Sequence, residues 1–295
     1  MGRNTWSAYQ LFFELLSPMH IGWRKVGNLQ QTRTYVLSRT IWGALTARLA
    51  RAAGAADDNT LYKKFGSMID DGLRFSYFYL TDSKMQLSCL AGSGGWPWRA
   101  EEVVGGAGSS TDLFDWKYLH SYNGSPVTEQ RVTQAGGLHE TELIMPFTRE
   151  GKKVYLTGIV FENKKNGLVI SNWKRSFNYL QLGGERSYGW GKVVLAEKMM
   201  GTDKLFGSDL RLDKLHPQVL LPANSFITSH VQLNKAASVE DFAGDVEVLA
   251  GRLTTKGGKY GRNFAAPLPC WAPGTKVLTE KYFDICSQGI WEESY

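Results

Sequence analysis

A glycine-rich stretch in the middle of the chain constrains its fold more than any other feature. Residues 180–195 hold four glycines within nine positions, interleaved with cationic and hydroxyl side chains. The residues concerned are Gly183, Gly184, Gly189, Gly191, Arg186, Ser187 and Lys192. Glycine costs backbone entropy, so such a cluster indicates positive φ angles or the close approach of another chain. Amide groups exposed beside arginine and lysine can also hold phosphates.

Neither of the common nucleotide-binding loops fits this stretch. A P-loop requires serine or threonine after Gly-Lys, but Val193 follows Lys192. A dinucleotide loop requires a glycine three residues after Gly191, where Val194 stands. The stretch also lies between a helix-like segment and a strand-like run, the wrong order for both motifs. Two interpretations therefore stay open: a phosphate cradle, or a tight turn that contacts no ligand.

Composition suits a well-packed protein with a polyanionic partner. With 295 residues and 43% hydrophobic content, the chain can form one large or two ordinary domains. The net charge is +6, and the span from Arg24 to Arg51 contains cationic residues but no acidic one. The three cysteines form no Cys-x-x-Cys pair, which argues against a zinc site and favours reduced thiols. We expect a cytoplasmic protein without signal peptide or membrane span, and without cofactor or metal.

The order of predicted elements indicates an α+β fold. Helices are predicted over 38–53, capped by Ser38, and over 172–182, capped by Ser171. Strands are predicted over 9–16, 73–81, 85–90, 141–145, 153–161 and 192–197. This order is close to a ferredoxin-like, or RNA-recognition-motif-like, β-α-β-β-α-β domain over residues 1–200, with a hairpin insertion over 126–147. Two helices would cover one face of the sheet, and the other face is the usual RNA platform.

Residues 201–295 are predicted to form a smaller C-terminal lobe. Strands are expected over 219–222 and 226–233, followed by a helix over 239–253. A second glycine-rich basic loop, 254–262, contains Lys259 and Arg262 and loosely echoes the first. The lobe is therefore interpreted as a possible degenerate second ferredoxin-like unit.

Three separated pieces of the sequence resemble one family. Residues 16–22, Leu-Ser-Pro-Met-His-Ile-Gly, precede a helix carrying Gly43-Ala44-Leu45, and this resembles the opening of RAMP-superfamily proteins of CRISPR systems. Residues 131–142 resemble the hairpin, or thumb, with which such subunits clamp guide RNA. Residues 182–193 are similar to the family's glycine-rich loop. The resemblance covers roughly residues 8–200.

The resemblance implies an RNA-recognition-like fold and a CRISPR guide RNA as ligand. It also implies membership of a type III effector complex, an antiviral ribonucleoprotein whose other RAMP subunits and large signalling subunit would be the partners. Backbone subunits of the family cut target RNA with an aspartate in the loop after His-x-Gly, but residues 22–56 contain no aspartate or glutamate. About a hundred residues follow the glycine-rich loop, which lies near the chain end in backbone subunits. Both departures point to the non-catalytic subunit that caps the five-prime end of the guide.

The RNA-binding residues follow from this interpretation. They are His20, Arg24, Lys25, Arg33, Arg39, Arg131, Gly183, Gly184, Arg186, Ser187, Gly189, Gly191, Lys192, Lys259 and Arg262. Two enzymatic alternatives remain. A guide-processing endoribonuclease could use His20 as a general base on a 2′-hydroxyl. A backbone subunit cutting target RNA would need a carboxylate from elsewhere, such as Asp57 or Asp58.

Overall fold

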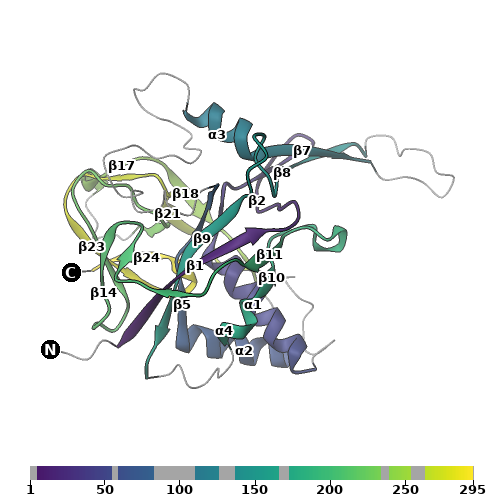
Figure 1. Ribbon diagram of the computed structural model, residues 1–295. Coiled ribbons are helices and arrows are strands. Elements are labelled where there is room, and N and C mark those ends of the chain that lie inside the picture. The colour runs from purple at the N-terminus through teal and green to yellow at the C-terminus, as the bar shows by residue number, and fades with distance from the viewer. Residues whose placement is uncertain are drawn as a thin grey trace.

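The structure is a computed structural model that describes residues 5–54, 59–82, 110–125, 137–165, 173–233, 239–253 and 263–294. These residues form a mixed α+β fold that is mostly strands with few helices. A central sheet carries helices on one face, a small sheet projects from it, and the C-terminal residues form a second large sheet (Figure 1).

The central sheet has eight strands in the order β10-β11-β1-β9-β6-β4, with β12 paired to β1 and β5 paired to β9. At its centre β1 and β9 run antiparallel, from Trp6 opposite Asn163 to Glu14 opposite Tyr155. Leu11, Phe12 and Phe13 are consecutive residues of β1 and all are buried, and since successive side chains point to opposite faces, both faces of the strand are covered. The strands are β1 (Trp6–Leu15), β4 (Tyr35–Val36), β5 (Leu73–Phe75), β6 (Phe78–Thr81), β9 (Tyr155–Asn163), β10 (Tyr179–Gln181), β11 (Lys192–Leu195) and β12 (Met200–Gly201).

Helices α1 (Ser38–Ala52), α2 (Asn59–Gly72) and α4 (Trp173–Ser176) lie together on one face of this sheet (Figure 1). The stripe Ile41, Leu45 and Leu49 of α1 is buried, which confirms the amphipathic pattern. The predicted cap is wrong: Leu37 occupies the capping position, and no side chain caps the helix. Ser38 is instead the first helical residue, and its hydroxyl has no partner among the described residues. Helix α2, which the sequence analysis missed, packs against α1.

The predicted helix over 172–182 is wrong for most of its length. Only the four residues of α4 are helical, and β10 follows, with Tyr179 paired to Val194 of β11. Phe177 and Leu180 are buried, and their spacing from Trp173 fits a helix. Pairing with a remote strand overrides that local periodicity, because burial can be satisfied equally well from a strand.

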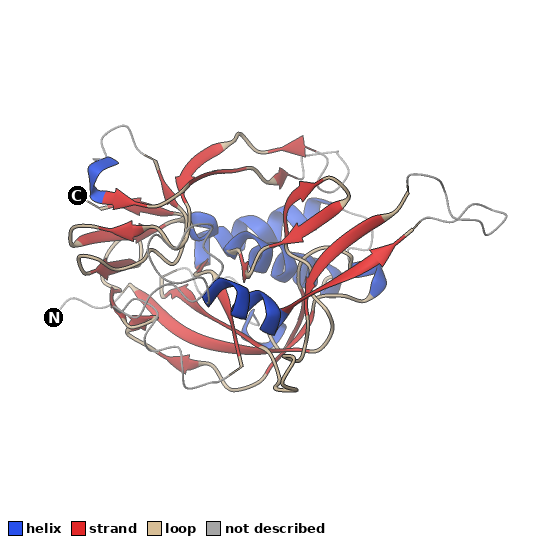
Figure 2. Cartoon of the chain, turned by 90° about the horizontal axis from the view of Figure 1, so that it is seen from above, coloured by secondary structure: helices blue, strands red, loops and turns tan. Residues whose placement is uncertain are grey.

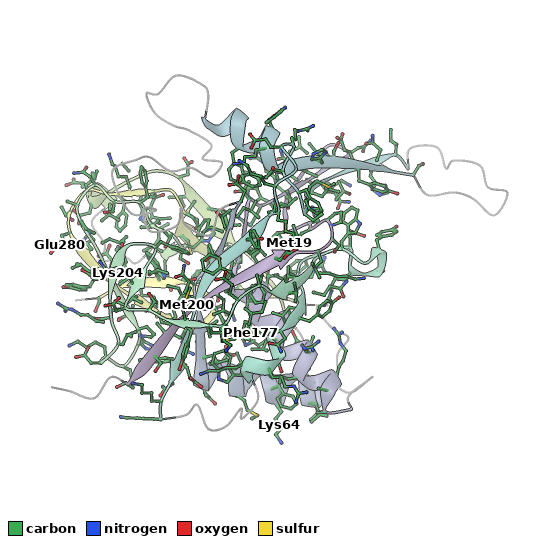
Figure 3. All side chains as sticks on the ribbon, viewed as in Figure 1. Met19, Lys64, Phe177, Met200, Lys204 and Glu280 are labelled. Atoms are coloured by element: carbon green, nitrogen blue, oxygen red, sulfur yellow. The ribbon has the colours of Figure 1, made fainter. Side chains whose placement is uncertain are left out.

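A four-stranded sheet projects from the central one, in the order β2-β3-β8-β7. Its strands are β2 (Gly22–Val26), β3 (Leu29–Thr32), β7 (Leu119–Gly124) and β8 (His139–Ile144), and α3 (Ser110–Tyr118) precedes β7. The far ends of β7 and β8 extend away from the body of the molecule (Figure 2). Met19 lies where β1 leads into this sheet, bonded through its amide and carbonyl to Ile144 (Figure 3). Residues 131–136 of the predicted thumb, and the predicted strand 85–90, lie outside the described residues.

The C-terminal sheet has the order β13-β14-β15-β23-β24-β16-β21-β18. Its strands are β13 (Lys204–Leu205), β14 (Ser208–Arg211), β15 (Gln218–Leu221), β16 (Val231–Gln232), β18 (Val246–Leu249), β21 (Leu268–Trp271), β23 (Lys281–Ile285) and β24 (Trp291–Glu293). Two short ribbons join β17 (Phe242–Ala243) to β22 (Lys276–Val277) and β19 (Arg252–Leu253) to β20 (Asn263–Phe264). The predicted helix over 239–253 is therefore wrong, because Val246 and Val248 lie in β18, which pairs with β21.

The C-terminal sheet and the central sheet share one continuous hydrophobic core. Phe206 packs edge-on against Tyr79, with ring centroids 5.5 Å apart. The indole of Trp6 in β1 donates to the carbonyl of Leu215 at 3.1 Å. The division into residues 1–200 and 201–295 stays a prediction.

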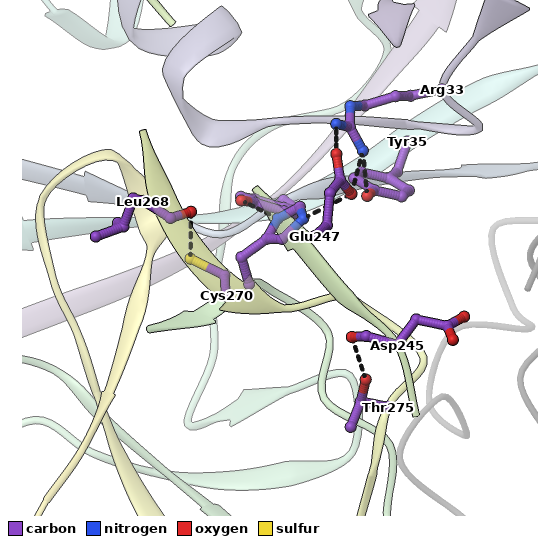
Figure 4. Close-up of polar contacts among 9 residues, drawn as sticks. Arg33, Tyr35, Asp245, Glu247, Leu268, Cys270 and Thr275 are labelled. Atoms are coloured by element: carbon purple, nitrogen blue, oxygen red, sulfur yellow. Dashed lines mark hydrogen bonds and ion pairs between the residues drawn. The ribbon is translucent and has the colours of Figure 1, made fainter. Parts of the chain in front are cut away.

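A buried polar network also joins the two sheets (Figure 4). The guanidinium of Arg33 binds both carboxylate oxygens of Glu247, and it donates to the hydroxyl of Tyr35 at 2.8 Å. The Nε2 of His230 lies 3.1 Å from Glu247, and its Nδ1 lies 2.7 Å from the hydroxyl of Tyr77. A carboxylate only accepts hydrogen bonds, so Nε2–H donates to it and Nδ1 accepts from Tyr77 in the neutral ring.

Burial alone would raise the pKa of Glu247. Hydrogen bonds from His230 and Arg33, together with the charge of Arg33, outweigh that effect and lower the pKa to about 2. Burial also lowers the pKa of His230, which keeps the ring neutral despite the neighbouring carboxylate. The ionised Glu247 is therefore the charge that balances Arg33.

Replacing this carboxylate should destabilise the fold in a pH-dependent way. Glu247→Gln should lower the free energy of unfolding by roughly 3 kcal/mol at neutral pH, because Arg33 would stay buried without a counter-charge. The folded pKa of Glu247 lies below its ordinary value of 4.5, so the carboxylate's contribution is complete above that pH and declines as pH falls toward about 2. The difference between wild type and variant should therefore narrow below pH 4.5 in urea unfolding curves. The exposed Glu292→Gln variant is the control, and equal stability of wild type and Glu247→Gln at pH 7 would contradict the account.

Candidate nucleic-acid interface

The glycine-rich loop is bonded to the residues that follow β1. The amide of Gly184 donates to the carbonyl of His20 at 2.9 Å, and that of Gly191 donates to the carbonyl of Pro18 at 2.7 Å. The hydroxyl of Ser17 donates to the carbonyl of Gly189 and accepts from the amide of Lys192, both at 2.9 Å. We call this set of contacts the backbone interlock. It makes one surface from two segments that are far apart in the sequence.

Two of the glycines are required by this interlock. Gly183 has φ +79°, and a Cβ there would lie 2.3 Å from the carbonyl oxygen of His20. Gly191 has φ +75°, and a Cβ there would lie 1.8 Å from the carbonyl oxygen of Leu182. At position 189 a glycine is favoured only by the φ of +80°, since a Cβ there would meet no close atom. A Cβ on Gly184 would meet nothing closer than 3.5 Å. The close approach that the glycines indicated is therefore an approach within the chain itself.

This arrangement corrects part of the predicted phosphate cradle. The amides of Gly184 and Gly191 donate within the interlock, and the amide of Gly189 donates to the carbonyl of Arg186 at 3.0 Å. These three amides are thus occupied inside the protein. What the loop exposes is the short 3₁₀ turn Arg186–Tyr188 and the side chain of Lys192. Side chains, rather than these amides, are the groups that can reach a ligand.

His20 has a fixed orientation beneath the loop. Its Nδ1 lies 2.7 Å from the carbonyl oxygen of Glu142 in β8, and a carbonyl only accepts, so Nδ1 carries the proton. The carboxylate of Glu142 in turn accepts from the amide of Thr32 at 2.9 Å. The Nε2 of His20 is therefore the lone-pair nitrogen of the neutral ring. With only 7% of its surface exposed, His20 can act as an acceptor, or as a base for a group brought close to it.

The small sheet sorts its cationic residues onto two faces. Directly opposed residues lie on the same face of a sheet. One such row crosses all four strands: Tyr122, Thr141, Gln30 and Lys25. Arg24, the next residue along β2, lies on the other face, where its Nε donates to Gln31 at 2.7 Å and its guanidinium lies over Trp23. Lys25 therefore shares the face of Tyr122, and Arg24 does not.

Three aromatic side chains link this face to the glycine-rich loop. The rings of Tyr122 and Trp190 meet edge-on, with centroids 5.7 Å apart, and Tyr188 lies 6.2 Å from Trp190. No role for these residues was predicted from the sequence. The aromatic content of the loop was visible in the sequence, but nothing local indicated that Tyr122 would lie beside it.

Two of the predicted RNA-binding residues have partners within the fold. Arg33 is buried in its ion pair with Glu247 and cannot reach a ligand. Arg39 in α1 is half-buried and donates to the carbonyl of Arg252 at 2.7 Å, and burial lowers its pKa. The assignment of Arg33 is corrected on these grounds, and that of Arg39 stays a prediction. Three other predicted residues lie outside the described part of the chain: Arg131, Lys259 and Arg262.

A further cavity lies elsewhere among the described residues. A polar cavity of about 450 Å³ lies in the C-terminal sheet, lined by residues including Arg211, Gln218 and Tyr282, and it contains none of the predicted site residues. Within the described ranges, no group of three or more His, Cys, Asp or Glu side chains is placed to hold a metal ion. None of the helices in those ranges is long and apolar enough to cross a membrane.

Comparison of the fold with solved structures finds similar chains. One chain in the cryo-EM structure of the type III-B Cmr-beta bound to cognate target RNA and AMPPnP, state 1, has a TM-score of 0.52 and 12% sequence identity. The match covers 91% of this chain and 85% of that chain. A chain in the type III-B Cmr-beta bound to cognate target RNA has a TM-score of 0.42 and 12% identity, covering 64% of this chain and 96% of that chain. At 12% identity, the first of these two matches shows a likeness of fold alone.

Comparison of the sequence identifies the family. No curated protein matches the chain. The family model of the RAMP superfamily matches residues 12–194, a segment that begins in β1, ends in β11 and includes His20 and the whole glycine-rich loop. Because the match covers more than half of the 295 residues, this chain belongs to the RAMP superfamily.

Proposed function

We propose that the chain is a non-catalytic, guide-RNA-binding subunit of a type III CRISPR effector complex. It would hold the five-prime region of the guide and dock other RAMP subunits and the large signalling subunit. Membership of the RAMP superfamily supports this, as does the likeness in fold to a chain of the type III-B Cmr-beta. The observation that carries the proposal is the backbone interlock, which holds the exposed turn Arg186–Tyr188 on the segment that contains His20.

The finer fold assignment is part of the same proposal. The antiparallel order β11-β1-β9-β6, with α1 and α4 inserted along the chain, supports a ferredoxin-like β-α-β-β-α-β domain. The projecting strands β7 and β8 would form the base of a thumb whose tip includes Arg131.

The chemistry of the surface fits an RNA backbone. Arg186, Lys192 and Lys25 are exposed cations on the loop and on the adjacent sheet face. The exposed hydroxyl of Ser187 and the Nε2 of His20 add a donor and an acceptor suited to phosphate and ribose 2′-hydroxyl groups. Such contacts hold a strand in register without reading its sequence.

Removing two loop cations should reduce the salt dependence of RNA binding. Each phosphate neutralised on a single strand contributes a slope of about −0.7 to a log-log plot of affinity against salt. Changing Arg186 and Lys192 together to alanine should therefore flatten the slope by about 1.4. Fluorescence anisotropy of labelled guide RNA over a salt series measures this.

A matched control removes the same charge from elsewhere. Lys64 in α2 and Lys204 in β13 are exposed and lie away from the glycine-rich loop (Figure 3). The double variant Lys64→Ala with Lys204→Ala should keep the wild-type slope. If both double variants change the slope equally, the effect comes from total charge, and the loop has no special role.

A guide-processing endoribonuclease is the second candidate, because the bond to Glu142 leaves the Nε2 of His20 as the basic nitrogen. We expect that the purified protein does not cleave repeat RNA, with or without magnesium, because residues 22–56 supply no carboxylate. Gel assays of wild type, His20→Ala and His20→Asn test this. Asparagine can keep the bond to Glu142 while removing Nε2, so wild-type cleavage lost in both variants would establish the nuclease.

Cleavage that needs magnesium and is lost in Asp57→Ala would favour a target-cutting subunit. Asp57 lies outside the described residues.

A further inference from the structure

Three aromatic rings form a cluster at the junction of the small sheet and the glycine-rich loop. Tyr122 comes from β7, Tyr188 from the 3₁₀ turn, and Trp190 lies between them in contact with both. The Tyr122 and Trp190 rings are perpendicular, and the Tyr188 and Trp190 rings are inclined at 43°. We call these three residues the aromatic cluster.

The cluster leaves much ring surface in water. Tyr188 is 70% exposed and Tyr122 is 53% exposed, whereas Trp190 is partly covered by its neighbours. Apolar surface in water is unfavourable by about 25 cal/mol per Å² relative to burial, so neighbouring exposed rings favour a partner that covers them.

The cluster rests on a rigid backbone. The side-chain amide of Gln181 in β10 donates to the carbonyls of Arg186 and Trp190, at 3.0 and 2.9 Å. Gly189 follows the 3₁₀ turn, and its φ of +80° sets the direction of the chain into Trp190. A platform held in this way loses little conformational entropy when a ligand binds.

We infer that the aromatic cluster is a stacking platform for an unpaired base of bound RNA. This inference rests on the proposed function. Lys25 shares the sheet face of Tyr122, and Arg186 and Lys192 flank the other two rings along the loop. Aromatic faces beside cations are the combination that binds single-stranded nucleic acid, because the rings stack on bases while the cations contact phosphates. Glu185, the one acidic residue of residues 180–195, is partly buried.

Stacking contacts and phosphate contacts affect the salt dependence of RNA binding differently. Tyr122→Ala and Tyr188→Ala should each weaken binding of single-stranded RNA by roughly 5- to 100-fold at every salt concentration, with an unchanged salt slope. Tyr122→Phe and Tyr188→Phe keep the ring and should bind within about twofold of wild type. Salt series by fluorescence anisotropy measure affinity and slope together, and melting curves confirm that each variant is folded.

A fluorescent base gives an independent readout. RNA carrying 2-aminopurine should lose fluorescence on binding to wild type at the position that stacks, and should retain it with the alanine variants. Normal RNA binding by both alanine variants would overturn the stacking inference and assign the cluster to a protein partner. A changed slope in the alanine variants would also overturn it, because the loss would then be electrostatic. Absence of RNA binding by the wild type would instead contradict the proposed function itself.

Discussion

The candidate interface depends on the backbone interlock between the residues after β1 and the glycine-rich loop. The carbonyls of Pro18 and His20 accept from Gly191 and Gly184, and any side chain at Gly183 or Gly191 would collide with backbone oxygen. Glycine is therefore used to bring two segments of the same chain together. This contact holds the turn Arg186–Tyr188 at the surface with its side chains exposed. The amides of the neighbouring glycines are used in hydrogen bonds within the protein. The loop's amides position the surface, and its side chains supply the chemistry.

Charge in the sequence does not determine charge on the surface. The basic span that begins at Arg24 predicted a polyanion-binding face, yet its members have different roles. Lys25 lies on the face of the aromatic cluster, Arg24 lies on the opposite face, and Arg33 is buried against Glu247. Burying Arg33 is tolerable only because Glu247 stays ionised beside it, with a pKa lowered to about 2. A cation that looked available for RNA thus joins the central and C-terminal sheets.

Sequence patterns correctly predicted the elements whose buried face can be recognised from their own residues. The apolar run of β1 and the Ile41, Leu45, Leu49 stripe of α1 needed no knowledge of partners, and the position of the glycine-rich loop was visible directly. Periodicity failed at β10 and β18, because each strand is specified by pairing with a remote strand, β11 or β21. Tyr122 was missed for the same reason: its neighbour Trp190 comes from a distant segment. The roles of Arg131, Lys259 and Arg262 stay predictions, since these residues lie outside the described ranges.

The central claim is that the glycines serve the fold while the loop's side chains serve the ligand. Melting and guide-RNA affinity of Gly191→Ala and Gly184→Ala, each measured on one preparation, test it most directly. Gly191→Ala should lower the free energy of unfolding by roughly 3 kcal/mol, from the left-handed backbone and the collision with Leu182. Its affinity for guide RNA should fall together with its melting temperature, because the interlock positions the side chains of the loop. Gly184→Ala should change neither quantity. Lost affinity at a wild-type melting temperature in Gly191→Ala would contradict the account, because the glycine would then be serving the RNA.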